Sequence, residues 1–245
     1  ITAEFDPQND EVPDIYSVRR SEADTRYRLS LAEGVTSWQV VEGLKLMDIL
    51  EGDAPQVPPE GTIAPDSYEV TKGTDRSALL ERMQAAQSER IARIWETRQE
   101  GLPISSPEEM LILASIIEKE TGIQEARRDV ASVFVNRLEA GMRLQTDPTV
   151  IYGLTKGQGV LGRGIRQSEL RKVTPWNTYV IEGLPPTPIA NPGVASLEAA
   201  VDPAETSFRF FVADGSGGHA FAETLEDHNR NVAKWRQIEA DRANN

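Results

Sequence analysis

The sequence predicts an α+β protein in which a small strand–helix–strand unit precedes a larger domain of helices and short strands. Three observations favour this class. Two alternating segments flank a helix signal near the N-terminus, two apolar helical segments occupy residues 107–138, and an alternating segment with a Gly-rich turn lies near the C-terminus.

Composition excludes several classes of protein and site. The 245 residues, 39% of them hydrophobic, can build a core without cross-links. The absence of cysteine excludes disulfides, thiolate metal sites and a cysteine nucleophile. A formal net charge of −13 repels polyanions, so we expect no nucleic-acid partner. The longest apolar run, Met110–Ile117, is too short to span a membrane, and because the chain starts at Ile1 rather than Met we expect that an upstream segment was removed.

The first elements form a small unit. Residues 1–26 are polar and predict a lead-in with one edge strand at Asp14–Arg19. Tyr27–Leu31 alternates as a strand, and a hydroxyl residue at 36–37 can cap the helix that follows. After a Pro-rich loop, Tyr68–Val70 predicts a returning strand.

Three long helices are predicted next. Thr74 or Asp75 can cap a helix that extends to about Gln99, where Gly and Pro end it. The next helix starts at Pro107 with two glutamates, which the helix dipole favours, and ends at Thr121 before a glycine. A further helix occupies about Gln124–Leu138. These signals divide the chain into a lead-in (1–26), a small module (27–73), a connecting helix (74–100) and a second domain (101–245).

The rest of the second domain is expected to hold a groove. Residues 141–193 are rich in Gly and Pro, so we expect loops and short elements that build a binding groove. The remaining predicted elements are a short helix at Ser196–Ala200, a strand from Phe208 to Val212, a turn at Asp214–Gly218, a strand at His219–Phe221 and a helix at about Leu225–Glu239.

Glu120 is the first candidate for chemistry. At roughly 100° per residue it shares a helix face with three large aliphatic side chains, whereas Glu118 points the other way. The aliphatic neighbours are Leu113, Ile116 and Ile117. Desolvation on that face would raise the pKa of Glu120 and keep it protonated as a general acid near neutral pH. The alternative is that Glu120 lies in a fraying last turn and bends to solvent.

Two loops carry side chains suited to sugar recognition. Gln145, Thr146 and Asp147 precede a proline, which favours extended backbone and short polar groups on a stiff loop. Trp176-Asn-Thr-Tyr179 places aromatic rings beside an amide. Both segments would look much the same as turn residues or as packing beneath a loop.

The two histidines are the remaining candidates. His219 and His228 could bind a metal ion together with Asp214, Glu223 or Asp227, but their spacing matches no zinc motif. We favour hydrogen bonding to the backbone as their role. A serine nucleophile and a phosphate-binding loop are not supported, because neither GxSxG nor GxxxxGK[ST] is present.

Several segments together resemble the MltG (YceG-like) family of endolytic murein transglycosylases. The resemblance runs in order from about Leu29 to Arg236. Its motifs are Leu113–Gly122, Val130–Leu138, Gly141–Gly153, Asn177–Tyr179, Gly183–Pro186, Ile189–Gly193, Phe211–Gly215, His219 and His228-Asn229. In that family the catalytic acid is the second Glu of Glu-Lys-Glu, which is Glu120 here. The departures are Trp176, where Tyr is common, and Thr187, where Gly is frequent.

The resemblance implies a fold and a reaction. It implies a LysM-like βααβ module over residues 27–73, followed by an α+β catalytic domain with a lysozyme- or transglycosylase-like helical site. The reaction cleaves the β-1,4 bond between N-acetylmuramic acid and N-acetylglucosamine, forms a 1,6-anhydro end and terminates glycan elongation. It uses one Glu as acid and base, with no cofactor and no metal. The candidates for holding the sugars are Gln145, Asp147, Asn177, Tyr179 and Asn191.

The resemblance also implies a location and partners. Family members act at the periplasmic face of the bacterial inner membrane, held by one N-terminal membrane helix that this chain lacks. The partners are peptidoglycan glycan strands and, as a further class, cell-wall synthases. Two other functions stay open: a non-catalytic cell-wall binding or scaffold protein, and a metal-dependent hydrolase that uses His219 and His228. Anhydro-ended products would distinguish the transglycosylase from both.

Overall fold

The computed structural model describes residues 11, 13–22 and 25–243, and it has the mixed helix-and-strand architecture that the sequence predicts. Its helices are α1 (Asp14–Ser21), α2 (Ser37–Leu46), α3 (Arg76–Trp95), α4 (Pro107–Glu120), α5 (Arg127–Glu139), α6 (Asp147–Thr155), α7 (Gln167–Leu170), α8 (Val194–Val201) and α9 (Leu225–Ala243), with a 3₁₀ turn at Gln124–Ala126. Its strands are β1 (Arg26–Ser30), β2 (Leu50–Glu51), β3 (Ser67–Thr71), β4 (Thr74–Asp75), β5 (Phe210–Ala213) and β6 (His219–Ala222).

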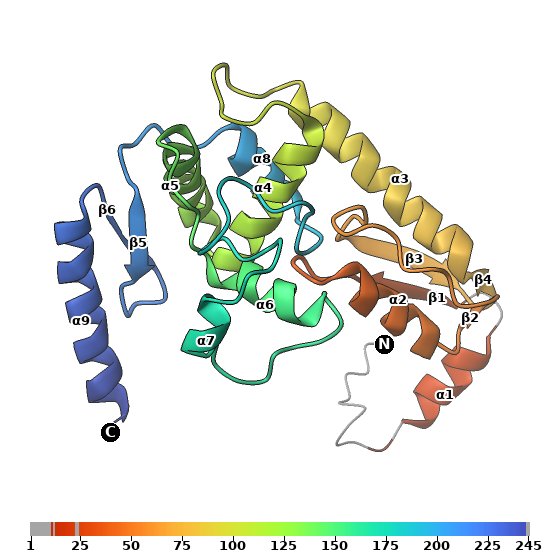
Figure 1. Cartoon of the computed structure of the whole chain (residues 1–245). Coiled ribbons are helices and arrows are strands. Elements are labelled where there is room, and N and C mark those ends of the chain that lie inside the picture. Colours follow the sequence, from red (N-terminus) through yellow and green to blue (C-terminus); the bar gives the residue numbers. More distant parts are fainter. Residues whose placement is uncertain (1–10, 12, 23–24, 244–245) are drawn as a thin grey trace.

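The small unit lies at one end of the molecule and the C-terminal hairpin at the other, with α4, α5 and α8 between them (Figure 1). In the small unit, β1 pairs antiparallel with β3, as expected. Tyr68 and Val70 point into a hydrophobic cluster together with Val41 of α2. Thr36 caps α2 and forms a reciprocal capping box with Gln39, which confirms the predicted helix start.

The expected βααβ pattern is wrong in one respect, because α2 is the only helix between β1 and β3. Residues 52–66, where a second helix would fall, form a loop. Several prolines in this loop lack the N–H that a helix needs. Instead, β2 and β4 make a two-residue parallel pairing that is too short to leave an alternation in the sequence.

Helix α3 connects two hydrophobic clusters. Its first half contributes Leu79 and Met83 to the cluster of the small unit, and its second half contributes Ile94 to the larger cluster. Between them, the fully buried Gln87 donates from Nε2 to the carbonyl oxygens of Gly61 (3.3 Å) and Pro192 (3.2 Å). The helix therefore belongs to both halves of the protein.

Helix α4 is the centre of the larger cluster. Pro107 lies in its first turn, as expected, Ser106 caps it, and every residue from Met110 to Ile117 is buried. Helices α5 and α8 pack against α4 and against each other. Because α4 is buried on all sides, an apolar face cannot by itself distinguish Glu118 from Glu120.

Two local expectations are wrong. The predicted edge strand at Asp14–Arg19 is helix α1, which starts after Pro13 with an acid in its first turn. Residues 1–10, 12 and 23–24 of the expected lead-in lie outside the described residues. Residues 145–147 are not extended throughout, because Gln145 has a left-handed φ of 52° and Asp147 opens helix α6 with a proline in its first turn.

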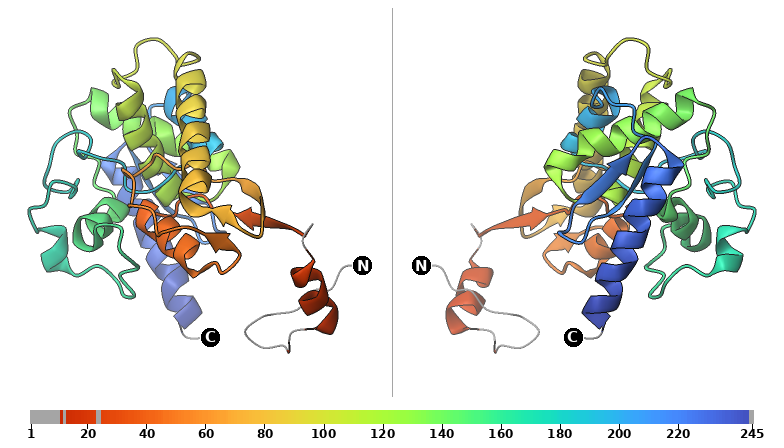
Figure 2. Two further views of the ribbon diagram at one scale, coloured as in Figure 1. Left: turned by 90° about the vertical axis from the view of Figure 1, so that its right-hand side faces the viewer. Right: turned by 90° about the vertical axis from the view of Figure 1, so that its left-hand side faces the viewer.

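The C-terminal segment forms the predicted hairpin and helix. Strands β5 and β6 pair antiparallel, with Phe211 opposite Phe221, and α9 packs along them. The two side views show α9 lying beside this hairpin and α1 standing away from the rest of the protein (Figure 2). Through Phe211 and Phe221 the hairpin packs against the cluster around α4 and α5, and so forms one wall of the cavity described next.

Candidate active site

Glu120 occupies the last position of α4 and faces a cavity of about 380 Å³. The residue is only partly buried, since part of its surface borders this cavity. The cavity is lined by Glu120, Phe134, Arg137, Leu144, Gln145, Thr146, Asp147, Tyr179, Phe210, Phe211, Leu225 and His228. Residues from α4, α5, α6, the loop before α6 and the C-terminal hairpin therefore meet at one carboxyl group.

The surroundings of Glu120 hold its pKa far above the ordinary value. Burial of the carboxyl raises the pKa from 4.5 to about 7, and the negative charge of Asp147 acts in the same direction. A hydrogen bond from Thr146 and the positive charge of Arg137 oppose the shift. Near neutral pH, then, a large fraction of this carboxyl carries a proton, as a general acid requires.

The loop before α6 aims the hydroxyl of Thr146 at Glu120. Thr146 Oγ1 donates to Glu120 Oε1, and the backbone N–H of Thr146 donates to Thr178 Oγ1 at 3.0 Å. Thr178 Oγ1 is also 2.8 Å from Thr149 Oγ1. The left-handed backbone of Gln145, whose N–H donates to the carbonyl of Thr178, makes the sharp turn that this arrangement needs.

Asp147 and Tyr179 form the second polar group on the cavity. The Tyr179 hydroxyl donates to Asp147 Oδ1 at 2.7 Å. Burial, together with this bond to Asp147, raises the pKa of Tyr179, so the phenol stays protonated. A carboxylate and a phenol in contact offer an acceptor and an aromatic face to a sugar. The sequence-predicted residues Gln145, Asp147 and Tyr179 thus share one cavity with Glu120.

Arg137 is a cavity residue that the sequence reasoning missed. Its guanidinium donates to the backbone carbonyls of Arg209 (2.6 Å) and Leu144 (2.8 Å), and lies 5.2 Å from the centre of the Phe210 ring. The available signal was its position, three residues after the buried Phe134, which places a charge on the inward face of α5. The backbone contacts fix the guanidinium at the edge of the site.

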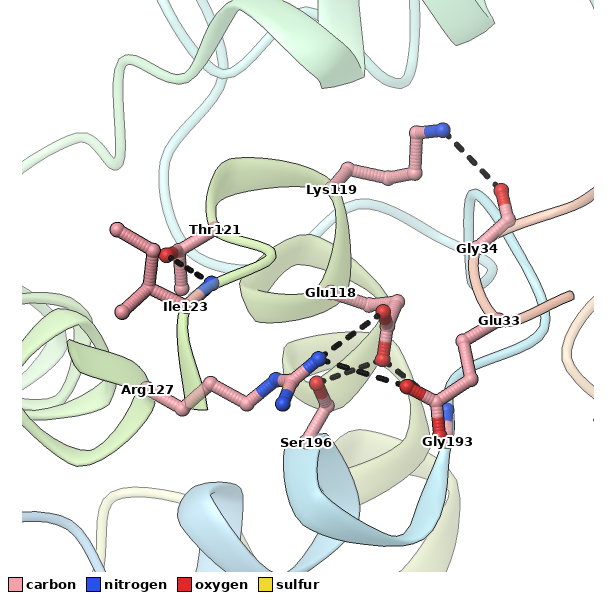
Figure 3. A network of polar contacts seen from close by, with 9 residues as sticks. All are labelled: Glu33, Gly34, Glu118, Lys119, Thr121, Ile123, Arg127, Gly193 and Ser196. Atoms are coloured by element: carbon pink, nitrogen blue, oxygen red, sulfur yellow. Dashed lines mark hydrogen bonds and ion pairs between the residues drawn. The ribbon is translucent and has the colours of Figure 1, made fainter. Parts of the chain in front are cut away.

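Glu118 has a different environment from Glu120, as expected. Its Oε2 accepts from the N–H of Gly193 (3.1 Å) and from Ser196 Oγ (2.7 Å), and its Oε1 lies 3.6 Å from Arg127. Arg127 also contacts Glu33 of the small unit at 3.4 Å. Figure 3 shows these side chains converging beneath the end of α4. Glu118 therefore stabilises the fold through these contacts and does not line the cavity.

Asn177 and Asn191 lie elsewhere than the sequence analysis expected for sugar-binding groups. The buried amide of Asn177 donates to the carbonyls of residues 169, 170 and 172, and its oxygen accepts from the Tyr179 N–H. The buried amide of Asn191 joins Ile63 and Val35 of the small unit to the second domain. Both side chains form hydrogen bonds with the protein's own backbone, so we do not propose either of them as a sugar contact.

Both histidines pack against aromatic rings of the hairpin. His228 stacks on Phe210 with 5.2 Å between ring centres and lines the cavity, while His219 meets Phe211 at 5.4 Å. Burial lowers the pKa of both imidazoles, although a hydrogen bond to the backbone of Glu120 and the charge of Asp214 oppose this for His219. Among the described residues, no group of three or more His, Asp and Glu side chains is arranged to hold a metal ion.

Comparisons with known proteins agree with the geometry. The model of the YceG-like family matches residues 7–234. A protein of Bacillus subtilis strain 168 named endolytic murein transglycosylase is 41% identical over 130 residues, which is 53% of this chain and 35% of that protein. One of the same name from Streptococcus pneumoniae serotype 2 is 32% identical over 182 residues, 71% of this chain and 32% of that protein.

A solved structure extends the comparison to the fold. It is a yceG-like protein of Listeria monocytogenes, with a TM-score of 0.67 and 34% identity over 83% of this chain and 75% of that one. The chain spans about one third of the length of the two curated relatives described above.

Proposed function

The chain belongs to the YceG-like family, and on that basis we propose that it is a lytic transglycosylase that cuts peptidoglycan glycan strands internally. The bond cut is the β-1,4 linkage from N-acetylmuramic acid to N-acetylglucosamine. The observation that carries the proposal is a carboxyl group with a pKa of about 7 that faces a cavity large enough for a sugar. Two relatives named endolytic murein transglycosylase support the choice of substrate.

In the first step Glu120 acts as a general acid. Because Oε1 accepts the Thr146 hydroxyl, Oε2 is the oxygen left to carry the proton. That proton passes to the glycosidic oxygen while the bond from this oxygen to C1 of the muramyl residue breaks. The leaving strand departs as an alcohol, C1 becomes oxocarbenium-like and Glu120 becomes a carboxylate.

In the second step Glu120 acts as a base. The 6-hydroxyl of the same muramyl residue attacks C1 and gives its proton to the Glu120 carboxylate, so the acid is restored and a 1,6-anhydro ring is formed. No water is consumed. Ordinary glycosidases need a second carboxylate as nucleophile or base, whereas here the substrate supplies the nucleophile.

The remaining cavity groups hold the sugars and set the charge around them. We assign hydroxyl and amide contacts to Gln145, Asp147 and Tyr179. The carboxylate of Asp147 also faces the positive charge that develops at C1, where a fixed negative charge is stabilising. Asp147 thereby performs two tasks, since its charge also helps to keep Glu120 protonated.

The wider role follows from the reaction. Internal cleavage with an anhydro end stops further growth of a strand, so we propose that the protein terminates glycan elongation outside the cytoplasm, at the periplasmic face of the inner membrane and next to cell-wall synthases. Within the described part of the chain, no helix is long and apolar enough to cross a membrane. We assign residues 27–73 to a LysM-like glycan-contacting module, 74–100 to the connection and 101–245 to catalysis.

Mass spectrometry of a glycan digest tests the proposal. We expect internal cleavage to products that end in anhydro-muramyl residues, each one water lighter than a hydrolysis product, and no cleavage by Glu120→Gln. Reducing ends in place of anhydro ends would contradict the mechanism and point to hydrolysis with Asp147 as the second carboxylate. Tight binding without cleavage by the wild type would instead indicate a non-catalytic scaffold.

A further inference from the structure

A second cavity of about 350 Å³ lies directly beside the first. Lys119 lines the second cavity and Glu120 the first, and Pro148 lines the second and Asp147 the first. Consecutive Cα atoms are about 3.8 Å apart, so neighbouring residues line the two cavities at the end of α4 and again at the start of α6. A polymer bound in the first cavity therefore passes close to the second.

The walls of the second cavity come from both halves of the protein. Thr36 and Gln39 belong to the small unit, whereas Tyr152 and Thr155 belong to α6. Thr36 Oγ1 donates to the carbonyl of Gly157 at 2.6 Å and so ties the small unit to the loop that follows α6. In Figure 1, α6 lies between α4 and α2. Hydroxyl, amide and aliphatic groups line this wall, a mixture suited to a short peptide.

One wall of the second cavity belongs to a segment whose charge is opposite to that of the whole protein. Residues 156–172 contain five basic residues and one acid, Glu169, in a chain whose net charge is −13. Gly157, Gly159 and Val160–Arg163 of this segment line the cavity. The segment therefore attracts an anion where the rest of the surface repels one.

Some of these cations are available to a ligand. Arg163 is held by Glu169 through bonds of 2.8 and 2.6 Å, but Arg166, Arg171 and Lys172 are exposed. Lys119 donates one hydrogen to the carbonyl of Gly34 at 3.1 Å, and an ammonium group has three (Figure 3). The lining of the cavity thus contains two cations, Lys119 and Arg163, and three further cations are exposed in the segment that forms part of its wall.

We propose that the second cavity and the basic segment 156–172 hold the carboxylate-bearing peptide branch of a muramyl residue whose glycan strand occupies the first cavity. This inference rests on the proposed function and names a further part of its substrate. A peptide branch leaves the sugar backbone sideways and carries free carboxylates, which matches a second cavity with a basic segment in its wall. Sugar alone carries no charge to pair with the exposed cations of that segment.

Binding to catalytically inactive protein tests the proposal without relying on turnover. We would measure the Kd of Glu120→Gln for glycan strands with their peptides and for the same strands after the peptides are removed by an amidase. We expect tighter binding of the peptide-bearing strands, and adding Arg166→Gln and Lys172→Gln should lower that preference by about two- to fivefold for each charge. Arg93→Gln, on the exposed side of α3, is the matched charge control and should leave the preference unchanged.

Two results would overturn the proposal. One is equal affinity for both kinds of strand. The other is a double variant that keeps the preference for peptide-bearing strands but loses binding to vesicles of anionic phospholipid, which would make the basic segment a membrane contact. Cleavage of peptide-free strands to anhydro ends by the wild type would support the proposed transglycosylase function whatever the binding measurements show. The experiment can therefore reject the peptide site without rejecting the proposed function.

Discussion

Ionisation of Glu120 should destabilise the folded protein, and the substitution Glu120→Gln should remove that effect. Folding raises the pKa of this carboxyl, so the folded state binds its proton more tightly than the unfolded chain does. The contribution of the group is favourable below the unfolded pKa and is lost as the pH rises through the folded value. Gln has nearly the same shape and does not ionise, so the variant keeps its stability over this range.

The magnitude follows from the size of the shift. A rise from 4.5 to about 7 corresponds to about 3 kcal/mol, because each pKa unit is worth about 1.4 kcal/mol. The free energy of unfolding of the wild type should therefore fall by about 3 kcal/mol relative to Glu120→Gln between about pH 4 and pH 9. For a chain of this size, that difference shifts the Tm by about 6–12 °C.

Paired thermal melts of the two proteins across this pH range provide the measurement, and a pH–rate profile on glycan strands accompanies them. The activity of the wild type should decline on the alkaline side with an apparent pKa of about 7, since the acid form disappears there. A Tm difference that stays constant from acid to alkaline pH would refute the reasoning, because it would mean that Glu120 is not desolvated in the folded state.

Four further predictions concern the same carboxyl, its neighbours and metal ions. Thr146→Val removes the hydrogen bond that lowers the pKa of Glu120, so the alkaline limb of the pH–rate profile should move to higher pH. Asp147→Asn removes a charge that raises this pKa, so the limb should move to lower pH; movement of both variants in one direction would exclude the assigned electrostatics. Glu118→Gln should lower stability by about 2 kcal/mol through weakened bonds to Gly193 and Ser196 and leave the limb in place, as thermal melts and the same profile would show. Activity should persist in excess chelator, because the proposed chemistry uses only a carboxyl and the substrate hydroxyl; a loss that added zinc restores would contradict it.

Elements with strong local signals were predictable from the sequence. Three such signals are the proline and acids at the start of α4, the capping residue of α2 and the glycine-rich turn between β5 and β6. Each acts within a few residues, so a single short segment is enough to predict it. The expected rise in the pKa of Glu120 agrees with its position beside the cavity, and its role as the acid stays a prediction. The argument from one apolar face was incomplete, since α4 is buried all round.

The features that could not be predicted from the sequence depend mainly on contacts between distant segments. Arg137 enters the site because backbone carbonyls of residues 143, 144 and 209 converge on it, and no spacing in the sequence reveals that. Asn177 and Asn191 have the composition of sugar-binding residues, but buried backbone groups take up their amides. Helix α1 was misread because its few apolar residues fit a strand as well as a helix.

The contact of Arg127 with Glu33 and Glu118 restricts how this protein can be recombined with others. Arg127 and Glu118 are nearly fully enclosed, and a Cβ on Gly193 would collide with the side chain of Glu33. Without an acid at residue 33, Arg127 would still contact Glu118, and because the side chain of Glu33 is partly exposed the loss would cost about 1 kcal/mol or less. A small unit grafted from another protein could keep this contact only if residue 193 stayed a glycine, which leaves room for the acid. We therefore expect the backbone at residue 193 to restrict which small units can be joined to this second domain more strongly than the charge at residue 33 does.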